Sequence, residues 1–252
     1  MAKRDYFKNT CAVVLAAGKG KRMKSNIPKV MHKIRGRPLI DYLVSTLEDL
    51  KIPKIILVVG YKKKMVFDFF KHKDFVFVEQ KKLLGTGHAV LQTKKLLEDF
   101  DGEVLILFGD VPFISGTTIE NLVKTHRRTK AQATVLTAVL DQPKGYGRII
   151  RREDGSLEKI VEDKDASPKE KKIKEMNTGI FCFNSRYLFP ALQKIKKENQ
   201  QGEYYLTDTV DILRKQKHKV SAFVTRDPKE ILGVNSMKQL KYLGKLMANN
   251  KI

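Results

Sequence analysis

The sequence predicts an α/β protein with a largely parallel sheet, and three observations lead to this prediction. The 252 residues suit one α/β domain, and a hydrophobic content of 42% can fill a sizeable core. Short, β-branched apolar runs recur along the chain, as strands buried on both faces of a sheet require. Segments with apolar residues at helical spacing separate these runs, which is typical of strand–helix–strand units with right-handed crossovers.

The first half contains four near-continuous apolar runs that we interpret as strands. They are CAVVLAAG (11–18), KIILVVG (54–60), FVFVEQ (75–80) and VLILFGD (104–110). Two intervening segments show the spacing of amphipathic helices, namely PLIDYLVSTLEDL (38–50) and GHAVLQTKKLLEDF (87–100). Pro38 can open the first of these helices because its missing N–H is not needed there.

After residue 130 the pattern changes, and a polar, charged span over 152–176 separates the expected strands. Strands are predicted over 133–140, 147–151, 179–184 and 219–225, and helices over 207–216 and 237–250. We therefore expect a single domain, 1–252, with one continuous sheet. Residues about 10–130 form its nucleotide-binding half, about 131–235 its substrate-binding half, and 236–252 a C-terminal helix.

The net charge of +22 favours anionic partners such as nucleic acid, anionic membranes or phosphorylated small molecules. The lysines are spread over the whole chain, so charge alone does not predict a nucleic-acid role. No apolar run approaches the roughly 20 residues of a membrane span. The run after the basic start MAKRDYFKNT is too short for a signal peptide, which makes a cytoplasmic location the expectation.

Cysteine and histidine spacing argues against a zinc site. Cys11 and Cys182 each lie in an apolar run, with no CxxC pattern, and are expected to be buried thiols. The five histidines also lack ligand spacing. His88, at the start of an expected helix, is interpreted as a structural hydrogen-bonding group.

The stretch LAAGKGKRMKSNIPK (15–29) follows the first expected strand and gathers basic side chains around two glycines. It is not a Walker A loop, and it lacks the third glycine of a dinucleotide-binding fingerprint. Small residues let backbone N–H groups approach a ligand, and Arg22 and Lys29 could surround a triphosphate. A basic surface turn explains the same residues, and both interpretations remain open at this point.

A carboxylate closes another expected strand at FGDVP (108–112), where Asp110 is well placed to hold Mg²⁺. The alternative is a turn or helix-capping aspartate before Pro112. Further clusters combine small and polar residues. Each is weak evidence for a binding site by itself, because glycine and asparagine commonly occur in turns. They are LLGTGHAVLQ (83–92), GYGR (145–148), IVEDKD (160–165), NTG (177–179) and GVN (233–235).

Taken in order, these clusters closely resemble the uridyltransferase domain of bacterial UDP-N-acetylglucosamine pyrophosphorylases, over about residues 10–250. LAAGKGKRM with IPK is shared by sugar nucleotidyltransferases broadly, whereas GTGHAV, IVEDKDAS, NTGIF and EYYLTD are more specific. The resemblance implies the nucleotide-diphospho-sugar transferase fold, a Rossmann-like, mixed and mainly parallel sheet with helices on both faces. It also implies a cytoplasmic enzyme that makes a peptidoglycan precursor for cell wall biogenesis.

The resemblance assigns roles to matching positions. Nucleotide binding falls to Leu15, Ala16, Ala17, Gly18, Gln80, Gly85 and Thr86. Arg22 and Lys29 match the phosphate-contacting basic pair and, with Asp110, the catalytic residues. Asp110 and the substrate-contacting Asn235 match the Mg²⁺ ligands, Mg²⁺ being the expected cofactor. Recognition of N-acetylglucosamine falls to Gly147, Glu162 and Asn177.

This sequence departs from the family pattern in three ways, which limits the properties that the resemblance implies for it. Lys21 stands where many relatives have threonine, and Phe108 stands where tyrosine is frequent. No hexapeptide repeat is present, so the acetyltransferase activity of the bifunctional enzymes, and the trimer built by their β-helix, are not expected from these residues. The oligomeric state stays open.

The implied reaction is attack by the sugar 1-phosphate of N-acetylglucosamine on the α-phosphorus of UTP, with release of pyrophosphate. Two alternatives stay open. One is the same chemistry on another hexose 1-phosphate or nucleotide, and the other is a non-catalytic relative that binds nucleic acid through its basic charge.

Overall fold

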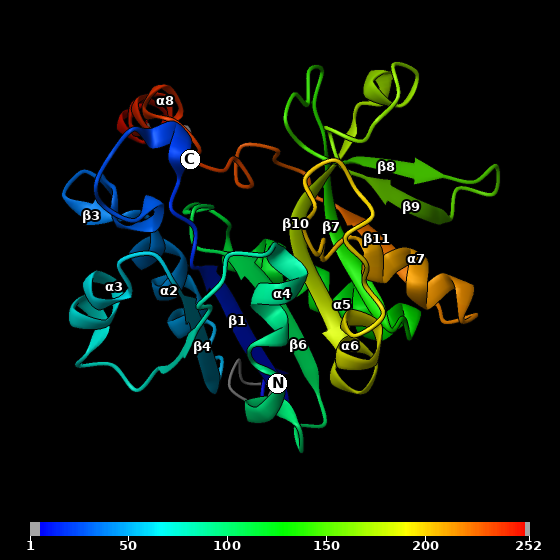
Figure 1. Ribbon diagram of the computed structural model, residues 1–252, viewed down its shortest axis with the longest axis horizontal. Helices are drawn as coiled ribbons and strands as arrows, with labels where there is room; N and C mark the ends of the chain where they lie inside the picture. The colour runs from blue at the N-terminus through cyan, green and yellow to red at the C-terminus, as the bar shows by residue number, and fades with distance from the viewer. Residues whose placement is uncertain (1–5, 250–252) are drawn as a thin grey trace.

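A nine-stranded mixed sheet forms the centre of the computed structural model, which describes residues 6–249 (Figure 1). Its strands are β1 (Thr10–Ala16), β4 (Lys54–Val59), β5 (Val76–Glu79), β6 (Glu103–Phe108), β7 (Ala133–Val139), β8 (Arg148–Arg151), β9 (Leu157–Val161), β10 (Glu175–Asn184) and β11 (Val220–Val224). The order is β11-β7-β10-β6-β1-β4-β5, and β8 joins β10 to β9. β10 runs antiparallel to β6 and β7, whereas the remaining neighbours along this order are parallel.

Helices cover both faces of this sheet (Figure 1). The α-helices are α2 (Leu39–Asp49), α3 (Lys63–Phe70), α4 (Thr86–Leu91), α5 (Gly116–Thr129), α6 (Ser185–Leu192), α7 (Asp208–Lys215) and α8 (Met237–Ala248). Short 3₁₀ turns are η1 (Lys21–Met23), η2 (Lys29–Met31), η3 (Lys94–Leu97) and η4 (Glu170–Lys172), and a small hairpin pairs β2 (Lys33–Ile34) with β3 (Arg37–Pro38).

Two apolar cores lie on opposite faces of the sheet. Ala12 and Val14 of β1 belong to the core shared with α2, α3 and α5, while Cys11 and Val13 belong to the core shared with α4, α6 and α7. Successive side chains of a strand point to opposite faces, so a strand covered on both faces needs an uninterrupted apolar run. The central strands could therefore be predicted from the sequence. Cys11 and Cys182 are buried free thiols, as expected.

Several elements differ from the sequence-based expectation. The helices α3, α5 and α6 were not predicted, and the helix expected over 87–100 is α4 followed by the separate turn η3. β9 lies inside the span 152–176 that was interpreted as a polar connection. Only Leu157 and Ile160 of β9 are buried, so this strand lacks the apolar run of a strand covered on both faces.

The last helix, α8, packs near the β2–β3 hairpin. α8 packs its Leu240 and Leu243 into a small cluster with Met23 and Ile34, beside the β2–β3 hairpin in Figure 1. Of the C-terminal segment expected over 236–252, residues 250–252 lie outside the described residues, as do residues 1–5 of the basic start. Within 6–249 no helix combines the length and the apolarity that crossing a bilayer requires.

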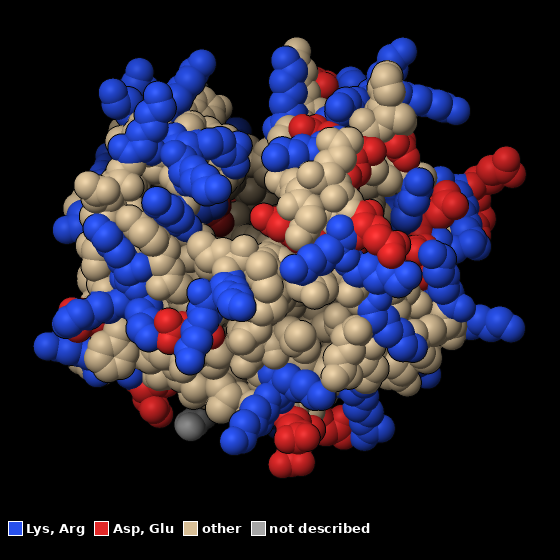
Figure 2. All heavy atoms as spheres, viewed as in Figure 1, with Lys and Arg blue, Asp and Glu red and all other residues tan. Residues whose placement is uncertain are grey.

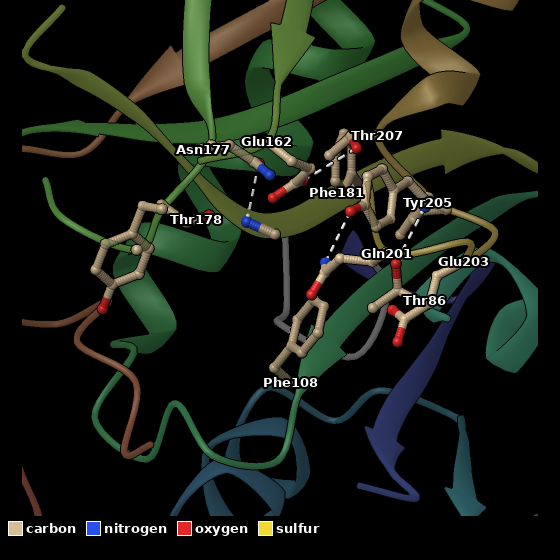
Figure 3. Close-up of a pocket in the computed structure, with 15 residues that line it drawn as sticks. Thr86, Phe108, Glu162, Asn177, Thr178, Phe181, Gln201, Glu203, Tyr205 and Thr207 are labelled. Carbon is tan, nitrogen blue, oxygen red and sulfur yellow. Dashed lines mark hydrogen bonds between the residues drawn. The ribbon is translucent and has the colours of Figure 1, made fainter. Parts of the chain in front are cut away.

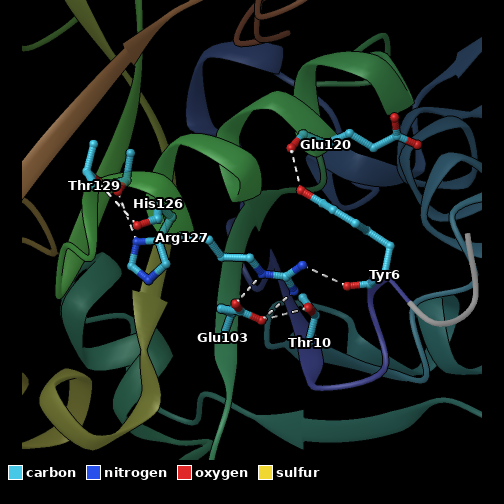
Figure 4. A network of polar contacts seen from close by, with 8 residues as sticks. Tyr6, Thr10, Glu103, Glu120, His126, Arg127 and Thr129 are labelled. Carbon is cyan, nitrogen blue, oxygen red and sulfur yellow. Dashed lines mark hydrogen bonds and ion pairs between the residues drawn. The ribbon is translucent and has the colours of Figure 1, made fainter. Parts of the chain in front are cut away.

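A polar network fixes the start of β1 (Figure 4). Arg127 of α5 donates two hydrogen bonds to the Glu103 carboxylate, at 2.6 and 2.9 Å, and a third to the Tyr6 carbonyl at 2.9 Å. Thr10 donates to the same carboxylate at 3.1 Å. Burial alone would raise the pKa of Glu103, but the hydrogen bonds and charge of Arg127 hold it below its usual value. The network ties α5, β6 and the N-terminal segment together.

Candidate active site

The candidate site lies where β1 and β6 end side by side. β4 and β5 lie on one side of β1 and β6 lies on the other, so the strand order reverses at the β1–β6 pair. α2 and α3 pack on one face of the sheet and α4 packs on the other. Such a switch point leaves a crevice at the carboxyl ends of the strands, where open α/β sheets bind ligands. The Gly109 N–H donates to the Leu15 carbonyl at 3.0 Å, which joins the two strand ends.

A cavity of about 340 Å³ opens at this point. Figure 2 shows the molecule hollowed between two upper lobes, with lysine and arginine side chains crowding the left rim. On the loop after β1, Lys19, Lys21, Arg22 and Lys24 are all exposed. Gly18 has open space around it, since a Cβ there would meet no atom within 4 Å. The loop can therefore bring its backbone close to a bound ligand.

Lys29 lines this cavity and is held between two side-chain oxygens. Its ammonium nitrogen is 2.5 Å from Asp110 Oδ2 and 3.0 Å from Asn235 Oδ1. Gly20 allows this packing, because a Cβ there would lie 2.7 Å from the Lys29 Cβ, and its φ of 67° also favours glycine. The Val234 N–H donates to the Asp110 carbonyl at 2.9 Å, which holds the loop of Asn235 against the end of β6.

The two oxygens that accept from Lys29 are also suitable ligands for Mg²⁺. Asp110 Oδ2 and Asn235 Oδ1 both accept from one cationic nitrogen, so they already converge on a single positive charge. A carboxylate and an amide oxygen are hard ligands, and Mg²⁺ is commonly held by one or two protein oxygens together with substrate phosphates and water. Asp110 is buried at 6% exposure, whereas Lys29 is partly exposed and has a flexible side chain. The residues present fit Mg²⁺.

The loop before α4 closes another side of the cavity. Gln80, at the end of β5, donates to the Gly85 carbonyl at 3.1 Å. Gly85 has a φ of 111°, and a Cβ there would lie 2.5 Å from the Tyr204 carbonyl, so this position requires glycine. Thr86 Oγ1 accepts from the Leu206 N–H at 3.0 Å. The GTGHAV and EYYLTD segments, 120 residues apart, thus form one wall.

His88 lies between two glutamine side chains. Its two ring nitrogens lie 3.0 Å from Gln80 Nε2 and 3.2 Å from Gln92 Nε2. Burial, and secondarily the charge of Lys197, lowers the pKa of His88. The ring therefore orients the Gln80 amide, which contributes to the cavity lining.

A second cavity, of about 210 Å³, adjoins the first (Figure 3). Thr86, Phe108 and Glu203 line both cavities, so the two cavities lie side by side. In Figure 3 the Glu162 and Asn177 side chains lie next to each other above the Phe108 ring. Thr207 Oγ1 donates to Glu162 Oε1 at 3.1 Å, and Asn177 Oδ1 accepts from the Gly179 N–H at 2.9 Å. Both groups therefore have fixed orientations.

Acidic neighbours and burial perturb carboxyl groups in and near the second cavity. Burial raises the pKa of Glu162, and the nearby charges of Asp208, Asp165 and Asp163 add to this rise. Burial and the charges of Asp165 and Asp211 raise the pKa of Asp208 to about 6. Carboxyl groups gather around this cavity, whereas the loop after β1 is basic, so the two cavities differ in chemical character.

The structure gathers most of the residues singled out from the sequence at these two cavities. Those that line a cavity are Leu15, Ala17, Gly18, Lys29, Gln80, Gly85, Thr86, Asp110, Gly147, Glu162 and Asn177. Asn235 joins them through Lys29. Ala16 is buried inside β1. Arg22 is exposed on η1 and is absent from both linings, whereas its neighbour Lys21 lines the first cavity.

Sequence reasoning missed other cavity residues. Tyr146, Gln201, Glu203 and Tyr205 line the second cavity, and Gln201 donates to the Tyr205 hydroxyl at 2.7 Å. Tyr146 accepts from the Gly233 N–H at 3.4 Å, and burial raises the pKa of its phenol. A signal existed, because Tyr146 stands between the glycines of GYGR and the other three stand in or beside EYYLTD.

A family model described as nucleotidyl transferase matches residues 11–229. The bifunctional proteins GlmU of Acetivibrio thermocellus, Lactobacillus gasseri and Limosilactobacillus reuteri are 48%, 47% and 44% identical to this chain. Those alignments cover 94%, 95% and 94% of this chain but 51%, 52% and 52% of the relatives. The chain therefore spans about half the length of these curated relatives.

A crystal structure of UDP-glucose pyrophosphorylase complexed with UDP-glucose shares the fold. It matches with a TM-score of 0.78 over 96% of this chain and 99% of that chain, at 19% sequence identity. The expected Rossmann-like, mixed and mainly parallel sheet of nucleotide-diphospho-sugar transferases is confirmed. The resemblance to the uridyltransferase domain of the bifunctional enzymes is likewise confirmed, and the chain belongs to the nucleotidyl transferase family.

Proposed function

We propose that this protein transfers the uridylyl group of UTP to N-acetylglucosamine 1-phosphate, forming UDP-N-acetylglucosamine and pyrophosphate. One observation carries the proposal: two adjoining cavities lie beside the end of β6, and the first of them also lies at the end of β1. One is basic and bears Lys29 and Asp110, and the other is lined by Glu162 and Asn177. A nucleoside triphosphate and a sugar phosphate can thus lie side by side.

In this proposal the nucleotide lies in the first cavity. Leu15, Ala17 and Gly18 present small residues and backbone groups to it, and Gln80 offers an amide, held by Gly85, to the base. Lys29 supplies positive charge to the phosphates. Arg22 is proposed to reach the triphosphate from the exposed loop, where its charge already acts on Tyr146.

The sugar phosphate lies in the second cavity. Gly147 leaves room for the ring, while Glu162 and Asn177 offer a carboxylate and an amide, whose hydrogen bonds can distinguish sugar hydroxyl and acetamido groups. Buried polar groups give strong discrimination, because a substrate that lacks a partner leaves them unpaired. This arrangement supports an N-acetylhexosamine as the sugar.

The reaction needs positioning more than acid–base catalysis. An oxygen of the sugar phosphate attacks the α-phosphorus, a new P–O bond forms, and the bond to the bridging oxygen of pyrophosphate breaks. A phosphate monoester carries most of its second negative charge at pH 7, so no strong general base is required. Lys29 stabilises charge on the α-phosphate and the leaving group, and each such contact supplies roughly 2–4 kcal/mol of barrier lowering.

Asp110 and Asn235 are the proposed ligands of Mg²⁺. When bound, the ion neutralises phosphate charge and orients the triphosphate. The role of the protein is to hold the two oxygens together, which the Val234–Asp110 backbone hydrogen bond does at 2.9 Å.

Pyrophosphate release tests the proposal. The purified protein is incubated with Mg²⁺, UTP and N-acetylglucosamine 1-phosphate, and pyrophosphate is measured with a coupled assay. Parallel arms contain glucose 1-phosphate, galactosamine and glucosamine analogues, and the other three nucleoside triphosphates. We expect the uridine and N-acetylglucosamine pair to give the highest kcat/KM.

Two outcomes contradict the proposal. A clearly higher kcat/KM with another sugar phosphate or nucleotide shows the same chemistry on a different substrate. Salt-sensitive RNA binding at submicromolar affinity, without pyrophosphate release from any pair, shows a nucleic-acid-binding relative instead. A cytoplasmic location and the production of a peptidoglycan precursor remain parts of the proposal.

A further inference from the structure

Arg148 is a buried cation at the start of β8, beside the second cavity. Its side chain is 3% exposed. Its Nη1 lies 3.2 Å from Asp163 Oδ1 and also donates to the Tyr146 carbonyl, and its Nη2 donates to the Lys171 carbonyl at 3.5 Å. One guanidinium therefore connects three segments of the chain.

Two of these segments border the proposed sugar cavity, and the third is connected to it through β10. Tyr146 directly precedes Gly147, Asp163 directly follows Glu162, and Lys171 lies in η4, on the connection that leads back to β10. Arg148 is also paired with Val161 in the β8–β9 ladder and with Met176 in the β10–β8 ladder. The guanidinium thus reaches the neighbours of the cavity residues without lining the cavity itself.

The cavity residues that flank Arg148 are packed closely enough for small shifts to matter. A Cβ on Gly147 would lie 3.3 Å from the Val161 carbonyl oxygen and 3.4 Å from each carboxylate oxygen of Glu162. The Asn177 N–H donates to the Gly147 carbonyl at 2.9 Å. Gly147 directly precedes Arg148, Glu162 directly precedes its partner Asp163, and Asn177 is hydrogen-bonded to Gly147.

The cost of burying Arg148 argues for a role beyond stability. Its Nε is buried and has no hydrogen-bond partner within the described chain, and its ion-pair partner Asp163 is one-third exposed. A buried ion pair with an unsatisfied donor is often no more stable than an apolar replacement. A planar group with several donors does, however, fix the relative position of the groups that accept from it.

We propose that Arg148 is a positioning residue that sets the distance between Gly147 and Glu162, and through it the selectivity for the sugar phosphate. This inference rests on the proposed function, since it names a determinant of the sugar half of that site. Arg148 acts through Tyr146 and Asp163 and does not touch substrate. Nucleotide binding, at the other cavity, is unaffected by it.

The test compares variants of the two partners with a matched control. Arg148→Gln removes the charge, Arg148→Lys keeps the charge but loses the planar fork, and Asp163→Asn removes the ion pair at a partly exposed position. Arg151→Gln is the control, because Arg151 lies on the same strand and pairs with Glu175 outside both cavities. KM for N-acetylglucosamine 1-phosphate and for UTP is measured separately for each variant.

We expect Arg148→Gln to raise KM for the sugar phosphate at least tenfold while KM for UTP changes less than twofold. Asp163→Asn should raise the sugar phosphate KM several-fold, and Arg148→Lys should lie between wild type and Arg148→Gln. Preference for N-acetylglucosamine 1-phosphate over glucose 1-phosphate should fall in the same order. Arg151→Gln should match wild type.

Equal changes in both KM values, or a control that behaves like Arg148→Gln, would overturn the proposal and leave Arg148 a structural residue. If Arg148→Gln fails to fold, Asp163→Asn decides by the same criterion. The wild-type assay reports separately on the proposed function. If wild type is inactive, the positioning role is tested by hydrogen exchange of the Asn177 amide. Equal protection of this amide in wild type, Arg148→Gln and Asp163→Asn would exclude the positioning role.

Discussion

The ammonium of Lys29 lies 2.5 Å from the carboxylate of Asp110, although the two residues are 81 positions apart in the chain. Asn235 accepts from the same ammonium, so the first and the last of the functional motifs meet at one point. This contact joins the loop after β1 to the end of β6. It also brings a flexible cation and a candidate metal ligand to the same place, which makes both residues direct targets for substitution.

Asp110→Ala should abolish Mg²⁺-dependent turnover while the fold survives. The side chain lies at the end of a strand and its backbone contacts to Val234 do not need the carboxylate. Pyrophosphate release measures activity, and circular dichroism with thermal unfolding measures folding. If Asp110→Ala kept activity close to that of wild type, Asp110 would not be part of the active site.

Lys29→Met should lower kcat/KM by about a hundredfold to a thousandfold, because methionine keeps most of the apolar stem but removes the charge that faces the phosphates. Lys24→Met is the control, since Lys24 is exposed and lines neither cavity. A similar loss in both variants would show that general basicity, and not the position of Lys29, supports turnover.

Gly179→Ala should destabilise the protein more than Gly155→Ala. Both glycines have a φ near 80°, which costs an L-residue about 1 kcal/mol. A Cβ on Gly179 would also lie 2.7 Å from the Phe108 ring, whereas Gly155 faces open space. Overpacking adds about 1–3 kcal/mol. Urea unfolding of both variants measures the difference, and equal losses would contradict the predicted clash.

His126→Gln should flatten the dependence of stability on pH between 4 and 6.5. His126 is buried against Thr134, and burial lowers its pKa from 6.5 to about 4, with the Glu103 charge opposing part of this. In that range the unfolded chain binds the extra proton, so stability rises with pH. The contribution lost on going from pH 6.5 to pH 4 is about 3 kcal/mol.

Denaturant unfolding of wild type and His126→Gln at several pH values measures this effect. The difference in unfolding free energy between the two proteins should change with pH in that range and should be constant above it. Parallel curves from pH 4 to pH 7 would show that burial does not depress the pKa of His126.

The central strands could be predicted from the sequence because burial on both faces requires an uninterrupted run of apolar residues. β1, β4, β6 and β7 appear as apolar runs within two residues of their observed limits. α5 was missed although Ile119, Leu122, Val123 and His126 are buried at helical spacing. β10 begins at Glu175, four residues earlier than expected, because the strand resumes pairing with β7 on the far side of an irregularity that contains Gly179.

Motif order along the chain determined the family and the expected site residues, because each motif keeps its residues adjacent in sequence. Only the tertiary structure decided which of these groups meet. Lys29 contacts Asn235 across 206 positions, and Thr86 contacts Leu206 across 120. Lys21 of the turn η1, and not Arg22, lines the first cavity. Side-chain direction depends on the local backbone and on packing against distant elements, neither of which composition or spacing records.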